Sequence, residues 1–303
     1  FPITANAYDS DPDIGSGWTR YYKGFVTKFN ERGDSLIFST YLGGNGSDLI
    51  HSMTLDDSNY IYIAGETKST DYPTTAGCFQ SKYGGDNGGG SWWTGGDAFL
   101  TKMKPDGTDL VFSTYIGGEN ADVAYEVALS PSNEIYLVGK TASDDFPLTP
   151  GSSIFNRNVK GTLDGFVCKF EQDGNDLVYS KMMGGSGEDW FEGVYINEID
   201  EAYVAGISKS SDFYTSNKAY QKSLKGGADI VVVKLNRLGQ NIRYSTYIGG
   251  SNDELYYSGF IYNSNVRISK NCTISNEATS NRSNFSNAKR FSNFSGSHNF
   301  LFN

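Results

Sequence analysis

The sequence predicts an all-β fold, a β-propeller built from four four-stranded blade repeats, and three observations predict it. A short motif recurs four times, the spacing inside each copy is constant over most of its length, and the composition suits short strands. The 303 residues include 36 Gly, 21 Tyr and 19 Phe but only 7 Pro. Aromatic residues favour strands, and glycines favour the tight turns that join them.

The recurring motif ends in a pair of glycines. It reads Ser-Thr-Tyr-Leu-Gly-Gly at 39–44 and Ser-Thr-Tyr-Ile-Gly-Gly at 113–118 and 245–250, with a diverged copy at 180–185. A second marker, an aromatic residue followed by Pro, stands at 1–2, 72–73 and 146–147, and its fourth copy, Phe213-Tyr214, lacks the Pro. Repeats of this length indicate a fold made of similar structural units.

The spacing between these fixed points separates packed segments from loops. A lysine precedes the second Gly by 16 residues in every copy, and in the first three copies the next aromatic marker follows that Gly by 28. The segment from the marker to the next lysine varies, at 27, 30, 23 and 21 residues. Constant length predicts packed strands, and variable length predicts surface loops. The pairs of lysine and glycine are Lys28/Gly44, Lys102/Gly118, Lys169/Gly185 and Lys234/Gly250.

The constant part predicts two hairpins in each copy. In the second copy, strands at 98–103 and 110–115 flank a turn at Pro105-Asp106-Gly107, and strands at 124–129 and 135–139 flank a second turn. Four strands make one propeller blade, so we expect each copy to fold as one blade. A parallel solenoid fits less well, because its coils use roughly 20–30 residues each.

These markers divide residues 1–265 into a propeller of four repeats and leave an Asn/Ser-rich tail at 266–303 with no predicted structure. Four blades is the low end for closed propellers. We therefore expect a fragment of a larger propeller, whose open blade edges could self-associate, in preference to a ring in which residues 1–8 pack beside the fourth blade. The expected repeats span about 1–71, 72–145, 146–212 and 213–265.

Charge and composition exclude several classes of function. The formal net charge is −10, which disfavours nucleic acid as a partner. The sequence contains no run of about 18 apolar residues, so no membrane span is predicted. Its first residues do not resemble a signal peptide. The three cysteines form no CxxC pair, and His51 and His298 are far apart in sequence, so a zinc site is not predicted.

Several segments of the second copy together resemble the SBBP-type β-propeller repeat, a family found mainly in bacterial and archaeal surface or secreted proteins. The segments are Asp97-Ala98-Phe99, Ser113–Gly118, Ile135–Gly139 and Asp145-Phe146-Pro147. The resemblance covers roughly residues 1–265 and implies a propeller at an extracellular or cell-surface location. It carries no catalytic motif to transfer. The seven blades that the family name implies exceed the four copies found here.

An acid stands four residues after the second Gly in every copy, at Asp48, Asp122, Asp189 and Glu254. A residue present in every blade usually holds blades together, whereas an active site is asymmetric. We therefore predict that these acids serve structural hydrogen bonds or ion pairs, most naturally with the four register lysines. The Gly-Gly-x-Gly-x-Asp pattern at 43–48 predicts a tight turn, because calcium-binding β-rolls repeat it every nine residues or so.

Two loops carry candidate binding residues. Asp9, Asp11 and Asp13 place carboxylates at alternate positions, a spacing that can converge on calcium, although a solvated acidic loop also explains them. The longest variable loop holds Asp86, Asn87, Trp92 and Trp93, and the first copy's loop holds Trp18. Adjacent tryptophans cannot both be buried by one strand, so these indoles could form a platform for sugar rings, with Asp86 and Asn87 bonding to hydroxyls.

No hydrolase or nucleotide-binding motif is present. The sequence therefore favours a non-enzymatic extracellular or cell-surface scaffold or binding module for glycans or surface proteins. It requires no cofactor, and calcium is the one ion that it suggests. The alternative is a carbohydrate-active enzyme, a glycoside hydrolase or lyase, that uses carboxylates on the propeller face.

Overall fold

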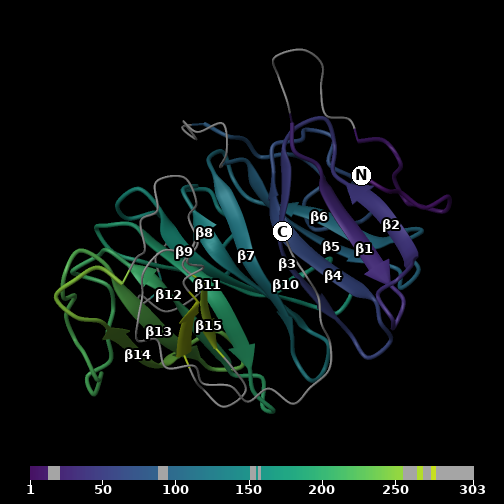
Figure 1. Ribbon diagram of the computed structural model, residues 1–303. Helices are drawn as coiled ribbons and strands as arrows, with labels where there is room; N and C mark the ends of the chain where they lie inside the picture. The colour runs from purple at the N-terminus through teal and green to yellow at the C-terminus, as the bar shows by residue number, and fades with distance from the viewer. Residues whose placement is uncertain are drawn as a thin grey trace, which may run out of the picture.

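The computed structural model describes residues 1–12, 21–87, 95–150, 155 and 158–254, together with the backbone of two short strands at 265–268 and 274–277. All regular elements among these residues are β-strands (Figure 1). The predicted all-β class is confirmed. None of the described segments is a helix long and apolar enough to cross a membrane.

Sixteen strands are described, and most of them run for six to eight residues. They are β1 (Gly24–Phe29), β2 (Leu36–Leu42), β3 (Asp48–Leu55), β4 (Ile61–Thr67), β5 (Asp97–Met103), β6 (Leu110–Ile116), β7 (Asp122–Leu129), β8 (Ile135–Thr141), β9 (Asp164–Phe170), β10 (Leu177–Met183), β11 (Asp189–Ile196), β12 (Ala202–Ser208), β13 (Asp229–Leu235), β14 (Ile242–Ile248), β15 (Asn265–Ile268) and β16 (Ile274–Glu277).

The described strands form three four-stranded antiparallel sheets and two two-stranded ones. The four-stranded sheets are β3-β4-β5-β6, β7-β8-β9-β10 and β11-β12-β13-β14, and the smaller sheets are β1-β2 and β15-β16. The prediction that one repeat copy forms one blade is therefore wrong. Each four-stranded sheet takes its first hairpin from one copy and its second hairpin from the next, because the aromatic marker lies in the loop between the second and third strands.

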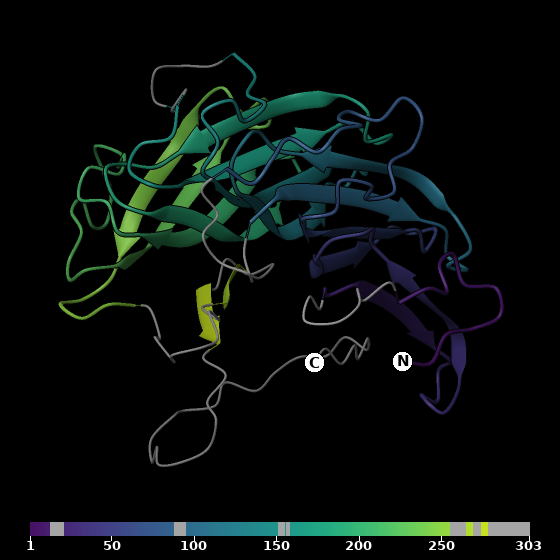
Figure 2. The same ribbon diagram turned by 90° about the horizontal axis from the view of Figure 1, so that it is seen from above.

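The sheets fan out as an arc, like blades of a propeller (Figure 2). The first strand of each sheet lies innermost, since β7 contacts β3 and β11 contacts β7. The fourth strands, β6, β10 and β14, lie at the outer edges. The short strand β15 contacts β11 and β12, as β11 contacts β7 and β8.

The segment after each aromatic marker runs along the outer strand. Thr75 N donates to Ser113 O over 3.0 Å, and Tyr115 N donates to Gln80 O over 3.1 Å, so this segment covers the edge of β6. The N-terminal segment does the same for β2, because Thr4 N donates to Ser39 O over 3.2 Å. The alternative in which residues 1–8 pack beside the fourth blade is therefore wrong: they pack on the hairpin of their own repeat.

Neighbouring sheets pack through a repeated contact between a turn glycine and an aromatic ring. Gly107, in the β5–β6 turn, has a positive φ of 71°. A Cβ atom added there would lie 2.2 Å from the Phe38 ring of the preceding sheet. Gly174 lies against Phe112 and Gly239 against Tyr179 in the same way. Only glycine can supply both the backbone conformation and this close approach.

Each inner strand carries a β-bulge that a glycine on the second strand permits. The register shifts between Ile50 and Ser52 in β3, and equivalent shifts occur in β7 and β11. Opposite the bulge of β7 stands Gly139, where an added Cβ would lie 1.8 Å from Val123 O. Bulges re-aim side chains, and the residues at the three bulges are His51, Tyr125 and Glu192.

Candidate functional site

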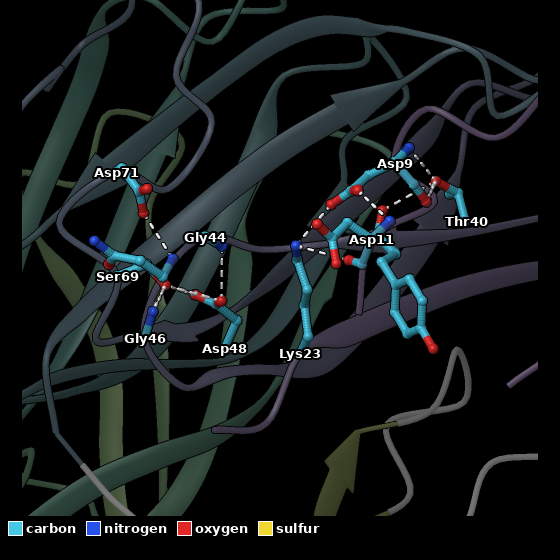
Figure 3. A network of polar contacts seen from close by, with 11 residues as sticks. Asp9, Asp11, Lys23, Thr40, Gly44, Gly46, Asp48, Ser69 and Asp71 are labelled. Atoms are coloured by element: carbon cyan, nitrogen blue, oxygen red, sulfur yellow. Dashed lines mark hydrogen bonds and ion pairs between the residues drawn. The ribbon is translucent and has the colours of Figure 1, made fainter. Parts of the chain in front are cut away.

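The acids that follow the glycine pairs hold the turn between one sheet and the next. Asp122 Oδ2 accepts hydrogen bonds from Gly118 N and from the Ser143 hydroxyl, both over 2.8 Å. Asp48 makes the same bonds to Gly44 N and Ser69 (Figure 3). Asp189 bonds Gly185 N and Ser210, and Glu254 bonds Gly250 N. These acids therefore have a structural role, as predicted.

Three register lysines form ion pairs, but the prediction that their partners are the acids after the glycine pairs is wrong. Lys102, Lys169 and Lys234 each form an ion pair, but with an acid of the turn between the first and second strands. The pairs are Lys102–Asp56 at 3.4 Å, Lys169–Glu134 at 2.7 Å and Lys234–Glu201 at 2.6 Å. The reason is position along the strand, since Lys102 pairs with Tyr62 near that turn, whereas Asp48 pairs with Thr67 at the opposite end of the same sheet. Lys28 donates instead to Pro105 O.

Two buried carboxyl groups meet where one sheet passes to the next. Asp97, the first residue of β5, accepts hydrogen bonds from Gly84 N and Gln80 Nε2. A Cβ added at Gly117 would lie 2.7 Å from Asp122 Oδ2 and 3.0 Å from Asp97 Oδ1. Burial raises the pKa of both carboxyl groups to about 7, despite the hydrogen bonds that lower it. Each of the two acids is therefore about half protonated near neutral pH.

In the first copy, Lys23 stands at the position that Asp97 occupies in the second, and it engages the candidate calcium loop. Lys23 Nζ lies 2.8 Å from Asp9 Oδ2 and donates to Asp11 O over 3.0 Å (Figure 3). Asp13 lies outside the described residues. No group of three or more His, Cys, Asp or Glu among the residues described could hold a metal ion. Calcium binding by Asp9, Asp11 and Asp13 stays a prediction.

Of the candidate sugar-binding residues, Trp18, Trp92 and Trp93 lie outside the described residues, whereas Asp86 and Asn87 are described. Asp86 Oδ2 lies 3.3 Å from Lys68 Nζ, and Asn87 N donates to Glu119 O over 2.9 Å. At the other end of this loop, Gly95 N donates to Glu66 Oε2 over 3.2 Å. Both ends of the loop are therefore fixed beside the glycine-pair turns.

A set of side chains on the inner strands differs in chemistry from sheet to sheet, although the positions are equivalent. The bulge positions hold His51, Tyr125 and Glu192, and one position of the second strands holds Glu66, Lys140 and Ile207. We call His51, Glu66, Tyr125, Lys140, Trp190 and Glu192 the inner-strand cluster. The sequence signal for it is a change of residue type inside a segment of constant length.

Contacts connect the cluster within and between sheets. His51 Nε2 lies 3.3 Å from Glu66 Oε1, whose side chain is 5% exposed. The His51 and Tyr125 rings meet edge to face at 5.5 Å, and Lys140 Nζ lies 5.6 Å from the Tyr125 ring centre. In the third sheet, Trp190 Nε1 donates to Glu192 Oε1 over 2.7 Å. Contacts thus join His51, Glu66, Tyr125 and Lys140 across the first two complete sheets, and join Trp190 to Glu192 within the third.

Burial and neighbouring charges set the charge of two residues of the inner-strand cluster, Tyr125 and Lys140. Burial raises the pKa of Tyr125, so its hydroxyl keeps its proton at neutral pH. Burial opposes the charge of Lys140, but Tyr125, Glu66 and Glu188 outweigh it and raise the pKa of Lys140 above its ordinary value. The site therefore offers a neutral phenol, an ammonium group, carboxylates and an imidazole oriented by Glu66. Such groups can hold a polar ligand through several hydrogen bonds.

A separate cavity of about 420 Å³ opens at the other end of the sheets. Asp56, Lys102, Asn133 and Gln172 are among the residues that line it. Two of them form the register ion pair described above, so the cavity belongs to the structural contacts between sheets.

The family model described as "Beta-propeller repeat" (SBBP) matches the chain twice, at residues 37–73 and 111–147. No curated protein matches the chain. A solved structure of a protein of unknown function from Bacteroides caccae shares 9% identity, with a TM-score of 0.17, over 77% of this chain and 92% of the other. That likeness carries no argument about fold or function. The chain is thus an all-β protein in which two segments match the SBBP β-propeller repeat.

Proposed function

We propose that the chain is a non-enzymatic scaffold or binding module that acts outside the cell or on its surface, and that its ligand contacts the inner-strand cluster. The SBBP repeats support a binding or scaffold role. The observation that carries the proposal is the contrast between repeated and varied residues. Repeated acids bond to their own turns, whereas the varied residues share one place on the inner strands.

The chemistry of the cluster suits a glycan or a protein surface. Aromatic rings at Tyr125 and Trp190 stand beside hydrogen-bonding groups of both charges, a mixture that recognises ligands with apolar and polar parts. The loop with Asp86 and Asn87 is fixed next to Glu66 through Gly95. We also propose that Trp18, Trp92 and Trp93 take part in ligand binding, as the sequence predicts.

The test is binding by wild type, His51→Ala and Lys140→Met on a glycan array and against surface proteins, followed by calorimetry. Thr54→Ala serves as the matched control, because Thr54 lies on the same strand as His51 but outside the cluster. We expect both cluster variants to lose at least about tenfold in affinity, since a polar ligand group left without its partner costs more than 1 kcal/mol. A ligand bound equally by all four proteins contradicts the proposal.

One observation favours the alternative, a carbohydrate-active enzyme. The buried Glu66 carboxylate orients His51 at 3.3 Å, which is the arrangement of a general base and its positioning group. Activity on a polysaccharide panel that Glu66→Gln abolishes without weakening binding supports the enzyme. Binding without turnover supports the module.

A further inference from the structure

Three of the glycine-pair turns each bring two carboxyl groups together. One group belongs to the first residue of the third strand of a sheet, and the other belongs to the acid that follows the glycine pair. A Cβ atom added to the first glycine of each pair would lie within 3.0 Å of both carboxyl groups. The pairs are Asp97/Asp122, Asp164/Asp189 and Asp229/Glu254. Asp229 and Glu254 are hydrogen-bonded to each other, and a hydrogen bond between two carboxyl groups needs a proton on one of them.

The pair formed by Asp97 and Asp122 has no cation to balance it. No ion pair joins either carboxylate to a Lys, Arg or His of the described residues. Lys68, which lies against Gly96, pairs with Asp86 instead. The pair is also surrounded by Asp86, Asp145, Tyr83, Tyr115 and Cys168. Burial raises the pKa of the two phenols and of the thiol, so these groups stay neutral, and ionisation of both acids would leave two adjacent charges unbalanced.

In the first copy an ion pair replaces the carboxyl pair. Lys23 stands where the second copy has Asp97. Asp9 stands where it has Gln80, since the backbone nitrogen of each donates to an equivalent threonine. Gln80 Nε2 donates to Asp97 Oδ2 over 2.9 Å, and the corresponding contact in the first copy joins Lys23 Nζ to Asp9 Oδ2 over 2.8 Å. A cation therefore takes this place in the first copy, whereas the second copy has a carboxyl group there that needs a proton.

The carboxyl pair of the second copy holds both described ends of the long loop. Asp97 accepts hydrogen bonds from Gly84 N over 2.8 Å and from Gly85 N over 3.3 Å. Asp122 N donates to Gly96 O over 2.7 Å. A displacement of Asp97 relative to Asp122 would therefore move the loop ends as well.

The same loop contacts the inner-strand cluster. Gly95 N donates to Glu66 Oε2 over 3.2 Å, and Glu66 Oε1 lies 3.3 Å from His51 Nε2. We propose that Asp97 and Asp122 hold one proton between them and that loss of this proton separates Gly95 from Glu66. The cause is repulsion between two adjacent carboxylates, which pushes Asp97 and the loop ends away from the turn. The further step, that this separation weakens ligand binding at the cluster, rests on the proposed function.

The first experiment follows backbone amide exchange by NMR between pH 6 and pH 8, expressed as protection relative to an unfolded peptide. We expect the protection of Gly84 and Gly95 to fall at least about tenfold, because the proton is lost across this range and one pKa unit corresponds to a factor of ten. Gly44 is the control. It donates to Asp48 in the first copy, where a lysine replaces the second carboxyl group, so its protection should not fall. Constant protection at Gly84 and Gly95 overturns the proposal.

Asp122→Asn tests the source of the effect. An amide group can donate to Asp97 at every pH, so the protection of Gly84 and Gly95 should no longer fall. Asp145→Asn is the matched control, because Asp145 binds the backbone of the same turn but lies outside the pair, and it should keep the fall. A fall that Asp122→Asn retains, or that Asp145→Asn abolishes equally, overturns the proposal.

A double variant keeps the test decisive if Asp122→Asn fails to fold. Gln80→Asp with Asp97→Lys copies the ion pair of the first copy and removes the carboxyl pair, so protection at Gly95 should be constant from pH 6 to pH 8. A fall of wild-type size in this variant contradicts the proposal. These measurements use the protein alone. A failed glycan array therefore contradicts only the proposed function, and constant wild-type protection contradicts only the proton coupling.

Discussion

The Lys169 ammonium lies 2.7 Å from Glu134 Oε2 in the second complete sheet, and the lysine side chain is only 1% exposed. The same ammonium lies 5.2 Å from the centre of the Tyr136 ring. Buried ion pairs are costly to break one side at a time, since the remaining charge loses its partner.

Lys169→Met should therefore destabilise the protein by about 3 kcal/mol, because Glu134 is left without its cation. Lys234→Met is the comparison, since Lys234 pairs with Glu201 but is 17% exposed, so water compensates for part of the loss. Urea unfolding monitored by tryptophan fluorescence measures both. Equal losses in the two variants would show that burial does not set the strength of this pair.

Stability should fall as pH rises from about 5 to 8. Burial raises the pKa of Asp97 and Asp122 to about 7, whereas an aspartate in the unfolded chain titrates near about 4. The folded state therefore holds protons that the unfolded chain has released, and this contribution is complete below about pH 4 and lost as pH passes 7. The urea midpoint at each pH measures the effect. Asp122→Asn should flatten the slope, and an unchanged slope would exclude the Asp122 carboxyl as a source of it.

Gly139→Ala should destabilise the protein more than Gly77→Ala. The new methyl group at Gly139 would collide with Val123 O at 1.8 Å and displace the bulge that carries Tyr125. At Gly77 a methyl group would meet nothing within 4 Å, so only the positive φ of 79° opposes it, a cost of about 1 kcal/mol. Thermal unfolding compares the two, and a loss at Gly139 no larger than that at Gly77 would argue against a rigid bulge.

Calcium binding by Asp9, Asp11 and Asp13, if the loop takes up the ion, must displace Lys23 from Asp9. Lys23→Met should then strengthen binding, because the competing ammonium at 2.8 Å is removed. Calorimetric titration of calcium into wild type and Lys23→Met measures the change. The control is Lys23→Met combined with Asp9→Asn, which should bind more weakly than Lys23→Met alone.

The sequence was sufficient to predict the strands but not how they are grouped. Constant spacing identifies segments that are held rigidly, and the strands at 98–103, 110–115, 124–129 and 135–139 all lie within observed ones. The passage from β6 to β7 is as constant in length as a hairpin turn, because Asp122 and Asp145 bind the backbone of Gly118 and Glu119. Length alone therefore cannot show where one sheet ends.

The inner-strand cluster escaped prediction for a related reason. A repeat pattern identifies positions at which the same residue type recurs. His51, Tyr125 and Glu192 occupy equivalent positions but differ in residue type, so the pattern does not identify them. Their common place depends on the bulges, which require the contact between Gly65, Gly139 or Gly206 and a carbonyl group of the neighbouring strand. That contact depends on tertiary pairing rather than on local sequence.

Because every complete sheet joins hairpins from two successive copies, the unit of duplication differs from the unit of folding. Recombination at an aromatic marker would add or remove one copy. The hairpins on the two sides of the junction would still combine into a complete four-stranded sheet. The number of blades could then change in evolution without a new interface having to arise. During synthesis, the same offset means that an inner hairpin such as β7-β8 leaves the ribosome before the strands that complete its sheet, β9 and β10, have been made.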